Sequence, residues 1–138
     1  MRLNSNGNYW WSVVYRISVC KNMEMNDLIK EAIWDAKIYR FSVYEDDAGH
    51  LSIDVFLESQ RPDHPKYLKL LFKDVKEYAF SWTDKYYFYY IRSYKYLRHN
   101  SLYYMSFDPD NEDDAISEND GDFILCSKVD VCINDAKF

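Results

Sequence analysis

The sequence predicts an α+β fold, in which a mostly antiparallel, curved sheet of about six or seven strands packs on one main helix. Most apolar residues alternate along short segments with the period of a β-strand, and one segment has the spacing of an amphipathic helix. Short connections join these segments, as between antiparallel neighbours. The chain has 138 residues, the size of one domain, so residues 1–138 are assigned to a single domain.

The N-terminal part predicts one strand followed by the helix. Apolar residues alternate along residues 9–20 and predict a strand. The helix is predicted over residues 26–36, because Asn26 can cap its N-terminus and Asp27 complements the positive end of the helix dipole. The apolar stripe of this helix consists of Leu28, Ile29, Ala32, Ile33 and Ala36.

The remainder of the chain predicts a hairpin and further strands. Residues 38–45 and 51–58 alternate and flank a loop in which Gly49 can adopt a positive φ, which is typical of a β-hairpin. Further strands are predicted over residues 67–73, 86–97, 101–107 and 123–133, and residues 74–80 fit either a helical turn or a continued strand.

The cysteines and the N-terminus bear on the cellular compartment. The three cysteines are odd in number and contain no C-x-x-C pair, so neither a disulfide framework nor a zinc ribbon is indicated. We expect Cys20, Cys126 and Cys132 to be reduced, partly buried thiols. The first residues lack an apolar leader segment, and no apolar run approaches the roughly 20 residues that cross a bilayer. The default expectation is therefore a cytoplasmic protein without a membrane partner.

The negative charge is concentrated in one segment. The formal net charge is −6, from 17 basic and 23 acidic residues, and eight of the acidic residues lie between residues 108 and 122. The rest of the chain carries 17 basic against 15 acidic residues and is nearly neutral. Such a segment repels phosphate backbones and attracts a basic partner. It is equally compatible with a solvated loop that only aids solubility.

Residues 86–97 form an aromatic segment that also contains Arg92 and Lys95. Its rings can pair across strands of a sheet, stack on single-stranded nucleic acid, or form a protein-binding face, since Tyr, Trp and Arg dominate interface hot spots. Basic residues are few here and the acidic segment follows closely. We therefore predict no nucleic-acid partner, and the sheet and protein-interface interpretations stay open.

No catalytic or metal-binding motif is present. Asp108, Asp110 and Glu112 match the first ligand positions of an EF-hand loop, but Asp113 replaces the required glycine and Asn119 replaces the final glutamate. Nucleotide-binding glycine loops, a G-x-S-x-G nucleophile elbow and a paired-histidine zinc motif are missing. The sequence predicts a protein that is not an enzyme and needs neither a cofactor nor a metal.

Residues 102–125 carry a resemblance to a known class of proteins. Residues 102–109, the acidic stretch and residues 122–125 resemble small, acidic, bacterial α+β immunity proteins of toxin/immunity systems in size, acidity and the order strand, acidic loop, strand. The resemblance implies a non-catalytic inhibitor that binds a basic toxin domain, such as a nuclease. The expected contacts are the acidic residues Asp110, Glu112, Asp113, Asp114, Glu118 and Asp120 and the aromatic anchors Tyr94, Tyr96 and Tyr104.

An alternative interpretation is a small-ligand-binding module. A curved sheet rich in aromatic residues can enclose a pocket for a sugar, a peptide or a lipid. A protein-binding protein remains the leading hypothesis because the acidic and aromatic segments are adjacent in the sequence.

Overall fold

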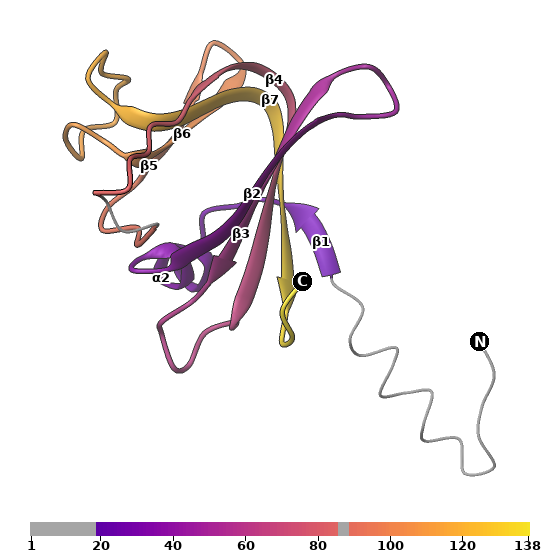
Figure 1. Ribbon diagram of the computed structural model, residues 1–138, viewed down its shortest axis with the longest axis vertical. Coiled ribbons are helices and arrows are strands. Elements are labelled where there is room, and N and C mark those ends of the chain that lie inside the picture. The colour runs from indigo at the N-terminus through magenta and orange to yellow at the C-terminus, as the bar shows by residue number, and fades with distance from the viewer. Residues whose placement is uncertain (1–18, 86–88) are drawn as a thin grey trace.

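The computed structural model describes residues 19–85 and 89–138, and it contains one short helix and seven strands within them (Figure 1). The predicted strand over residues 9–20 lies largely outside the described residues. The elements are β1 (Val19–Asn22), α2 (Asp27–Ile33), β2 (Lys37–Glu45), β3 (Leu51–Glu58), β4 (Tyr67–Ala79), β5 (Lys95–His99), β6 (Leu102–Asp108) and β7 (Gly121–Asn134).

The strands form one antiparallel sheet, as predicted. The strand order is β2-β3-β4-β7-β6-β5, and β1 also pairs with β7. Strand β7 lies at the centre of the sheet and has neighbours on both sides. On one side, the whole length of β4 pairs with β7. On the other side, β6 pairs with the first half of β7 and β1 with the second half. The predicted hairpin is β2 and β3, and Gly49 in its loop has a φ of 82°.

The sheet is strongly curved, because β4 and β7 bend together (Figure 1). The register of β4 against β7 shifts between Val75 and Glu77, and the neighbouring Asp74 has a φ of 51°. Such a bulge bends a strand and increases its twist. The carboxylate of Asp74 accepts a hydrogen bond of 2.7 Å from Ser127 Oγ on β7, which ties the two strands at the bend. Residues 74–79 are therefore a continued strand.

The helix is shorter than predicted and covers only part of the concave side of the sheet. Asn26 caps it as expected, with its Oδ1 accepting the backbone N–H of Ile29 at 2.9 Å. The helix ends at Ile33, and Asp35 adopts a φ of 61°, so the predicted extension to Ala36 is wrong. A helix of seven residues cannot cover a seven-stranded sheet, and the prediction that the sheet packs on a main helix overstated its share.

The core is one cluster of buried residues to which both α2 and the strands contribute. Ile29 and Ile33 of the helix are buried, and they belong to the same cluster as the alternating residues of the central strands. Large buried side chains from the strands include Ile38, Ile53, Leu57, Leu68, Leu70, Phe72, Met105 and Ile124.

Among the described residues, no helix combines the length and the apolar composition needed to cross a bilayer.

The aromatic segment is not the long strand that its alternation predicts. Residues 86–88 lie outside the described residues. Within residues 89–97 the strand begins at Lys95, and it is preceded by an isolated antiparallel bridge between Tyr90 and Lys37. The backbone of Ile91 bonds instead to the connection after the helix. Its carbonyl accepts from Asp35 N at 2.8 Å, and its N–H donates to Ala36 O at 2.9 Å. These bonds hold this stretch beside the start of β2 instead of along β6.

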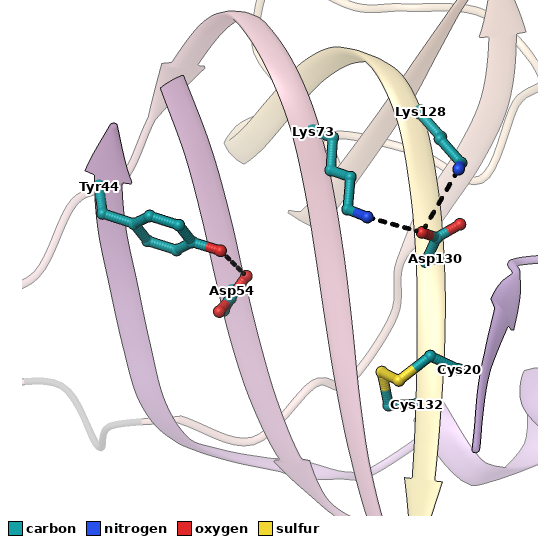
Figure 2. The surroundings of a disulfide bond; sticks show 7 residues. All are labelled: Cys20, Tyr44, Asp54, Lys73, Lys128, Asp130 and Cys132. Atoms are coloured by element: carbon teal, nitrogen blue, oxygen red, sulfur yellow. Dashed lines mark hydrogen bonds and ion pairs between the residues drawn. A yellow bond between two sulfur atoms is a disulfide. The ribbon is translucent and has the colours of Figure 1, made fainter. Parts of the chain in front are cut away.

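A disulfide joins Cys20 and Cys132, so the prediction of reduced thiols is wrong for these two cysteines (Figure 2). The antiparallel pairing of β1 with β7 places the two residues directly opposite each other, with their Cα atoms 4.0 Å apart. They are 112 residues apart in the sequence, and the pairing of their strands is not visible from it. Cys126 is a free, buried thiol, and burial raises its pKa to about 12.

Candidate partner-binding site

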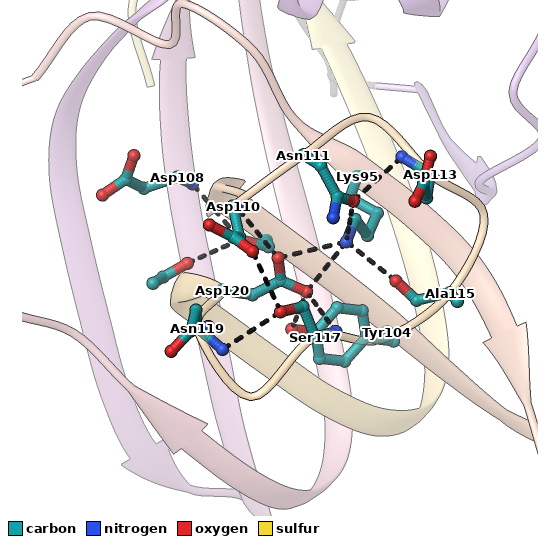
Figure 3. Close-up of polar contacts among 12 residues, drawn as sticks. Lys95, Tyr104, Asp108, Asp110, Asn111, Asp113, Ala115, Ser117, Asn119 and Asp120 are labelled. Carbon is teal, nitrogen blue, oxygen red and sulfur yellow. Dashed lines mark hydrogen bonds and ion pairs between the residues drawn. The ribbon is translucent and has the colours of Figure 1, made fainter.

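A buried ion pair anchors the acidic loop, residues 109–120, which connects β6 to β7 (Figure 3). Lys95 Nζ lies 3.0 Å from Asp120 Oδ2, and the two side chains are 3% and 0% exposed. Lys95 Nζ also donates to the carbonyl of Ala115 at 2.8 Å and contacts Asn111 Oδ1 at 3.4 Å. Buried charges are tolerated only when they are paired and hydrogen-bonded in this way. A cation from the start of β5 therefore holds the loop from the inside.

Asp120 is the acceptor around which the loop is organised. Besides Lys95, it accepts the backbone N–H groups of Asp110 and Ser117 at 2.9 and 3.0 Å and the hydroxyl of Tyr104 at 2.9 Å. Burial alone would raise the pKa of Asp120. The backbone and side-chain donors outweigh burial and hold this pKa at about 2. Asp120 is thus ionised at physiological pH and closes the loop at both of its ends.

The Lys95–Asp120 pair leaves the loop's other carboxylates on its surface. Glu112, Asp113, Asp114 and Glu118 are exposed, and in the described chain none of them forms a salt bridge. Asp110 is exposed too and accepts a hydrogen bond of 3.3 Å from Ser117 Oγ. The exposed carboxylates of the loop are therefore not paired with a cation, while Lys95 and Asp120 hold the loop backbone on its buried side.

A groove of about 440 Å³ separates this loop from α2. The loop contributes Glu112, Asp113 and Asp114 to its lining, and the opposite wall is formed by α2 and the residues flanking it. The remaining lining residues are Met25, Asp27, Lys30, Trp34, Tyr94, Lys95 and Tyr96.

Three aromatic residues of the groove are held in fixed positions. Tyr94 donates its hydroxyl to the carbonyl of Lys30 at 3.1 Å, and Tyr96 donates to the carbonyl of Met23 at 3.3 Å. The rings of Trp34 and Tyr94 meet edge to face, with centroids 6.3 Å apart. Both tyrosine hydroxyls are thus already engaged with main-chain carbonyls, and the aromatic rings are what these side chains offer to a ligand.

The groove lining is negative overall. It carries four carboxylates, on Asp27, Glu112, Asp113 and Asp114, against the ammonium groups of Lys30 and Lys95. The charge of Lys95 is neutralised by Asp120 beneath the loop. Of the two lysines in the lining, this leaves Lys30 to balance the four carboxylates. A site with aromatic walls and excess carboxylates is suited to a cationic group.

The structure brings five of the nine predicted contact residues into one groove. Asp110 and Glu118 lie on the same loop but do not line it. Asp120 and Tyr104 are buried below the loop, where Tyr104 is 2% exposed and stacks on Phe123. These two residues position the loop from its buried side and are not exposed on its surface. The five groove residues are Tyr94, Tyr96, Glu112, Asp113 and Asp114.

Sequence reasoning missed the helical wall of the groove. Asp27, Lys30 and Trp34 follow one another at spacings of three and four residues, which places them on one side of a helix. They lie away from the buried positions Ile29 and Ile33. A tryptophan in that row on a non-core face is the signal that could have identified this wall.

A second cavity, of about 500 Å³, lies near the start of β7. It contains none of the predicted contact residues. Asp122, in its lining, accepts hydrogen bonds from the backbone N–H of Ser81 and the hydroxyl of Tyr89. Its lining includes Trp82, Tyr89, Tyr90, Phe107, Asp108 and Asp122.

The comparisons with known proteins found no match, so the functional proposal rests on the geometry of the groove. Neither a protein-family model, nor a curated protein, nor a solved structure matches the chain. In the described ranges, no group of three or more histidine, cysteine or carboxylate side chains is placed to hold a metal ion. The groove between α2 and the acidic loop is the candidate site, because predicted charged and aromatic residues converge there.

Proposed function

We propose that this chain is a non-catalytic protein that binds a basic protein partner through the groove between α2 and the acidic loop. The observation that carries the proposal is the shared lining of one groove by the carboxylates of residues 112–114 and the rings of Trp34, Tyr94 and Tyr96. Negative charge raises the rate of encounter with a basic partner, and desolvated aromatic anchors slow its dissociation.

The buried anchor of the loop supports this function. A surface that binds a partner tightly loses less conformational entropy when it is ordered beforehand. The Lys95–Asp120 pair and the two backbone N–H groups bound by Asp120 order the loop without using the exposed carboxylates. Residues 112–114 are therefore available to a partner on a backbone that is already in place.

The partner class follows from the charge and from the resemblance of residues 102–125 to bacterial immunity proteins. We infer a toxin domain with a basic surface, such as a nuclease, which this chain neutralises by covering its active site or a surface near it. A cytoplasmic location belongs to the same proposal, because an immunity protein must meet a toxin that acts inside the cell. It requires that the fold persist when Cys20–Cys132 is reduced.

Affinity capture from the native host tests the proposal. The tagged wild-type chain is compared with two variants of equal net charge, Asp113→Lys/Asp114→Lys in the groove and Glu45→Lys/Asp47→Lys on the exposed hairpin. We expect a stoichiometric basic protein with the wild type and the hairpin variant at low salt, and its loss with the groove variant. Equal capture by all three would exclude the groove as the binding site.

The second cavity supports the alternative function of a small-ligand-binding module. Its volume of about 500 Å³ and its aromatic and carboxylate lining suit a polar ring such as a sugar. A small molecule that binds there would raise the Tm of the chain, and Trp82→Ala would abolish that shift. A panel of sugars and peptides without any Tm shift would leave the protein-binding function as the better supported of the two.

A further inference from the structure

We propose that the groove recognises an arginine side chain of the partner, an inference that rests on the proposed function. The first argument is the chemistry of the walls. Trp34, Tyr94 and Tyr96 contribute planar rings whose positions are fixed by packing and by the hydrogen bonds to Lys30 O and Met23 O. A guanidinium is planar and weakly hydrated and stacks on such rings, whereas an ammonium is a compact, strongly hydrated charge.

The second argument is the supply of acceptors. Asp27 lies on the helical wall, and Glu112, Asp113 and Asp114 lie on the loop. Across residues 19–85 and 89–138, none of these four carboxylates takes part in a salt bridge. A guanidinium presents five N–H donors in a fixed fork and can satisfy carboxylates on more than one side, which a lysine ammonium does with less geometric specificity.

The third argument is that the groove's own cations do not satisfy these carboxylates. Lys95 Nζ is bound by both oxygens of Asp120 and by Ala115 O, and it is 3% exposed. Lys30 lines the helical wall, but among the described residues its ammonium group forms no salt bridge. An anionic ligand would meet four carboxylates, and it would find both tyrosine hydroxyls already donated to carbonyls. Charge complementarity therefore favours a cation with an extended planar head.

The test is an NMR titration of the full chain with three short peptides that differ at one residue. The peptides are acetyl-Gly-Gly-Xaa-Gly-Gly-amide with arginine, lysine or citrulline as Xaa. We expect the arginine peptide to shift the indole N–H of Trp34 and the amides of residues 112–114, with an affinity about fivefold above that of the lysine peptide. The citrulline peptide, which keeps the shape and lacks the charge, should cause no saturable shift.

Matched variants locate the effect. Asp113→Asn/Asp114→Asn should weaken binding of the arginine peptide by about three- to tenfold, since two charge-assisted acceptors are lost. Glu45→Gln/Asp47→Asn removes the same charge from the exposed hairpin and should leave the affinity unchanged. Lys30→Glu removes the opposing cation of the helical wall and should strengthen binding.

The possible outcomes separate this inference from the proposed function. Equal affinity for the arginine and lysine peptides, at the same groove residues, would overturn arginine recognition and leave a basic partner at this site. Saturable binding of citrulline would also overturn it, because charge would then not matter. If neither basic peptide shifts the groove residues at millimolar concentration, the arginine inference is wrong. The proposed function of the groove is then decided separately, by whether Asp113→Lys/Asp114→Lys loses the captured basic partner.

Discussion

Lys95 and Asp120 form an ion pair that is buried beneath the acidic loop, with a distance of 3.0 Å between Nζ and Oδ2. Replacing one partner leaves an uncompensated buried charge. Asp120→Asn should therefore lower the free energy of unfolding by about 3 to 5 kcal/mol. Lys95→Met/Asp120→Asn should recover part of this loss, because the buried charge is gone while the introduced amide oxygen still accepts one backbone N–H. Urea denaturation measures both, and a double variant less stable than Asp120→Asn would contradict this role of the pair.

The same carboxylate gives the fold a pH dependence of known sign. The pKa of Asp120 is held at about 2, below the ordinary value of 3.8. Its contribution to stability is fully present above about pH 4 and is lost as the pH falls towards 2, and it amounts to about 2 kcal/mol. The difference in unfolding free energy between wild type and Asp120→Asn should shrink by that amount over this range. A constant difference would show that Asp120 does not titrate there.

The disulfide should contribute strongly to stability. Cys20 and Cys132 are 112 residues apart, and closing a loop of this length stabilises a fold by roughly 2 to 5 kcal/mol. Reduction or Cys20→Ser/Cys132→Ser should lower the free energy of unfolding by that amount, and reduction should have no further effect on the double variant. Titration of thiols in the unfolded, unreduced chain should give one thiol, from Cys126. Three titratable thiols would contradict the pairing.

The tyrosines of the groove have separable structural and binding roles. Tyr94→Phe and Tyr96→Phe each remove one hydrogen bond to a main-chain carbonyl and should cost about 0.5 to 1.5 kcal/mol of stability. Because both rings remain, affinity for the basic partner should change little. Trp34→Ala removes a ring of the wall and should weaken partner binding by more than tenfold, a typical hot-spot loss. Calorimetric titration of the three variants tests this order, which would be wrong if Trp34→Ala bound normally.

Local patterns were sufficient for much of the fold. The β2–β3 hairpin follows from the alternation of its two strands and from Gly49, and the start of α2 follows from Asn26. Both signals act over a few residues. The alternation of residues 86–97 misled the prediction, because the backbone of Ile91 bonds to Asp35 and Ala36, which a strand pattern cannot reveal.

Contacts between distant residues could not be predicted from the sequence. Charge counting located the acidic loop but gave Asp113 and Asp120 the same role, although one is exposed and the other is buried against Lys95. The buried contact of Asp120 with Lys95 joins residues that are 25 positions apart in the chain. It depends on the pairing of β5 with β6. The Cys20–Cys132 bond depends in the same way on the pairing of β1 with β7.

The most direct test of the central claim is the affinity of the purified basic partner for three forms of this chain over a range of salt concentrations. We expect Asp113→Lys/Asp114→Lys to bind at least tenfold more weakly than wild type and to show a smaller salt dependence. Glu45→Lys/Asp47→Lys has the same net charge and should bind like wild type. If the groove variant kept both the affinity and the salt dependence of wild type, the groove between α2 and the acidic loop would not be the binding site.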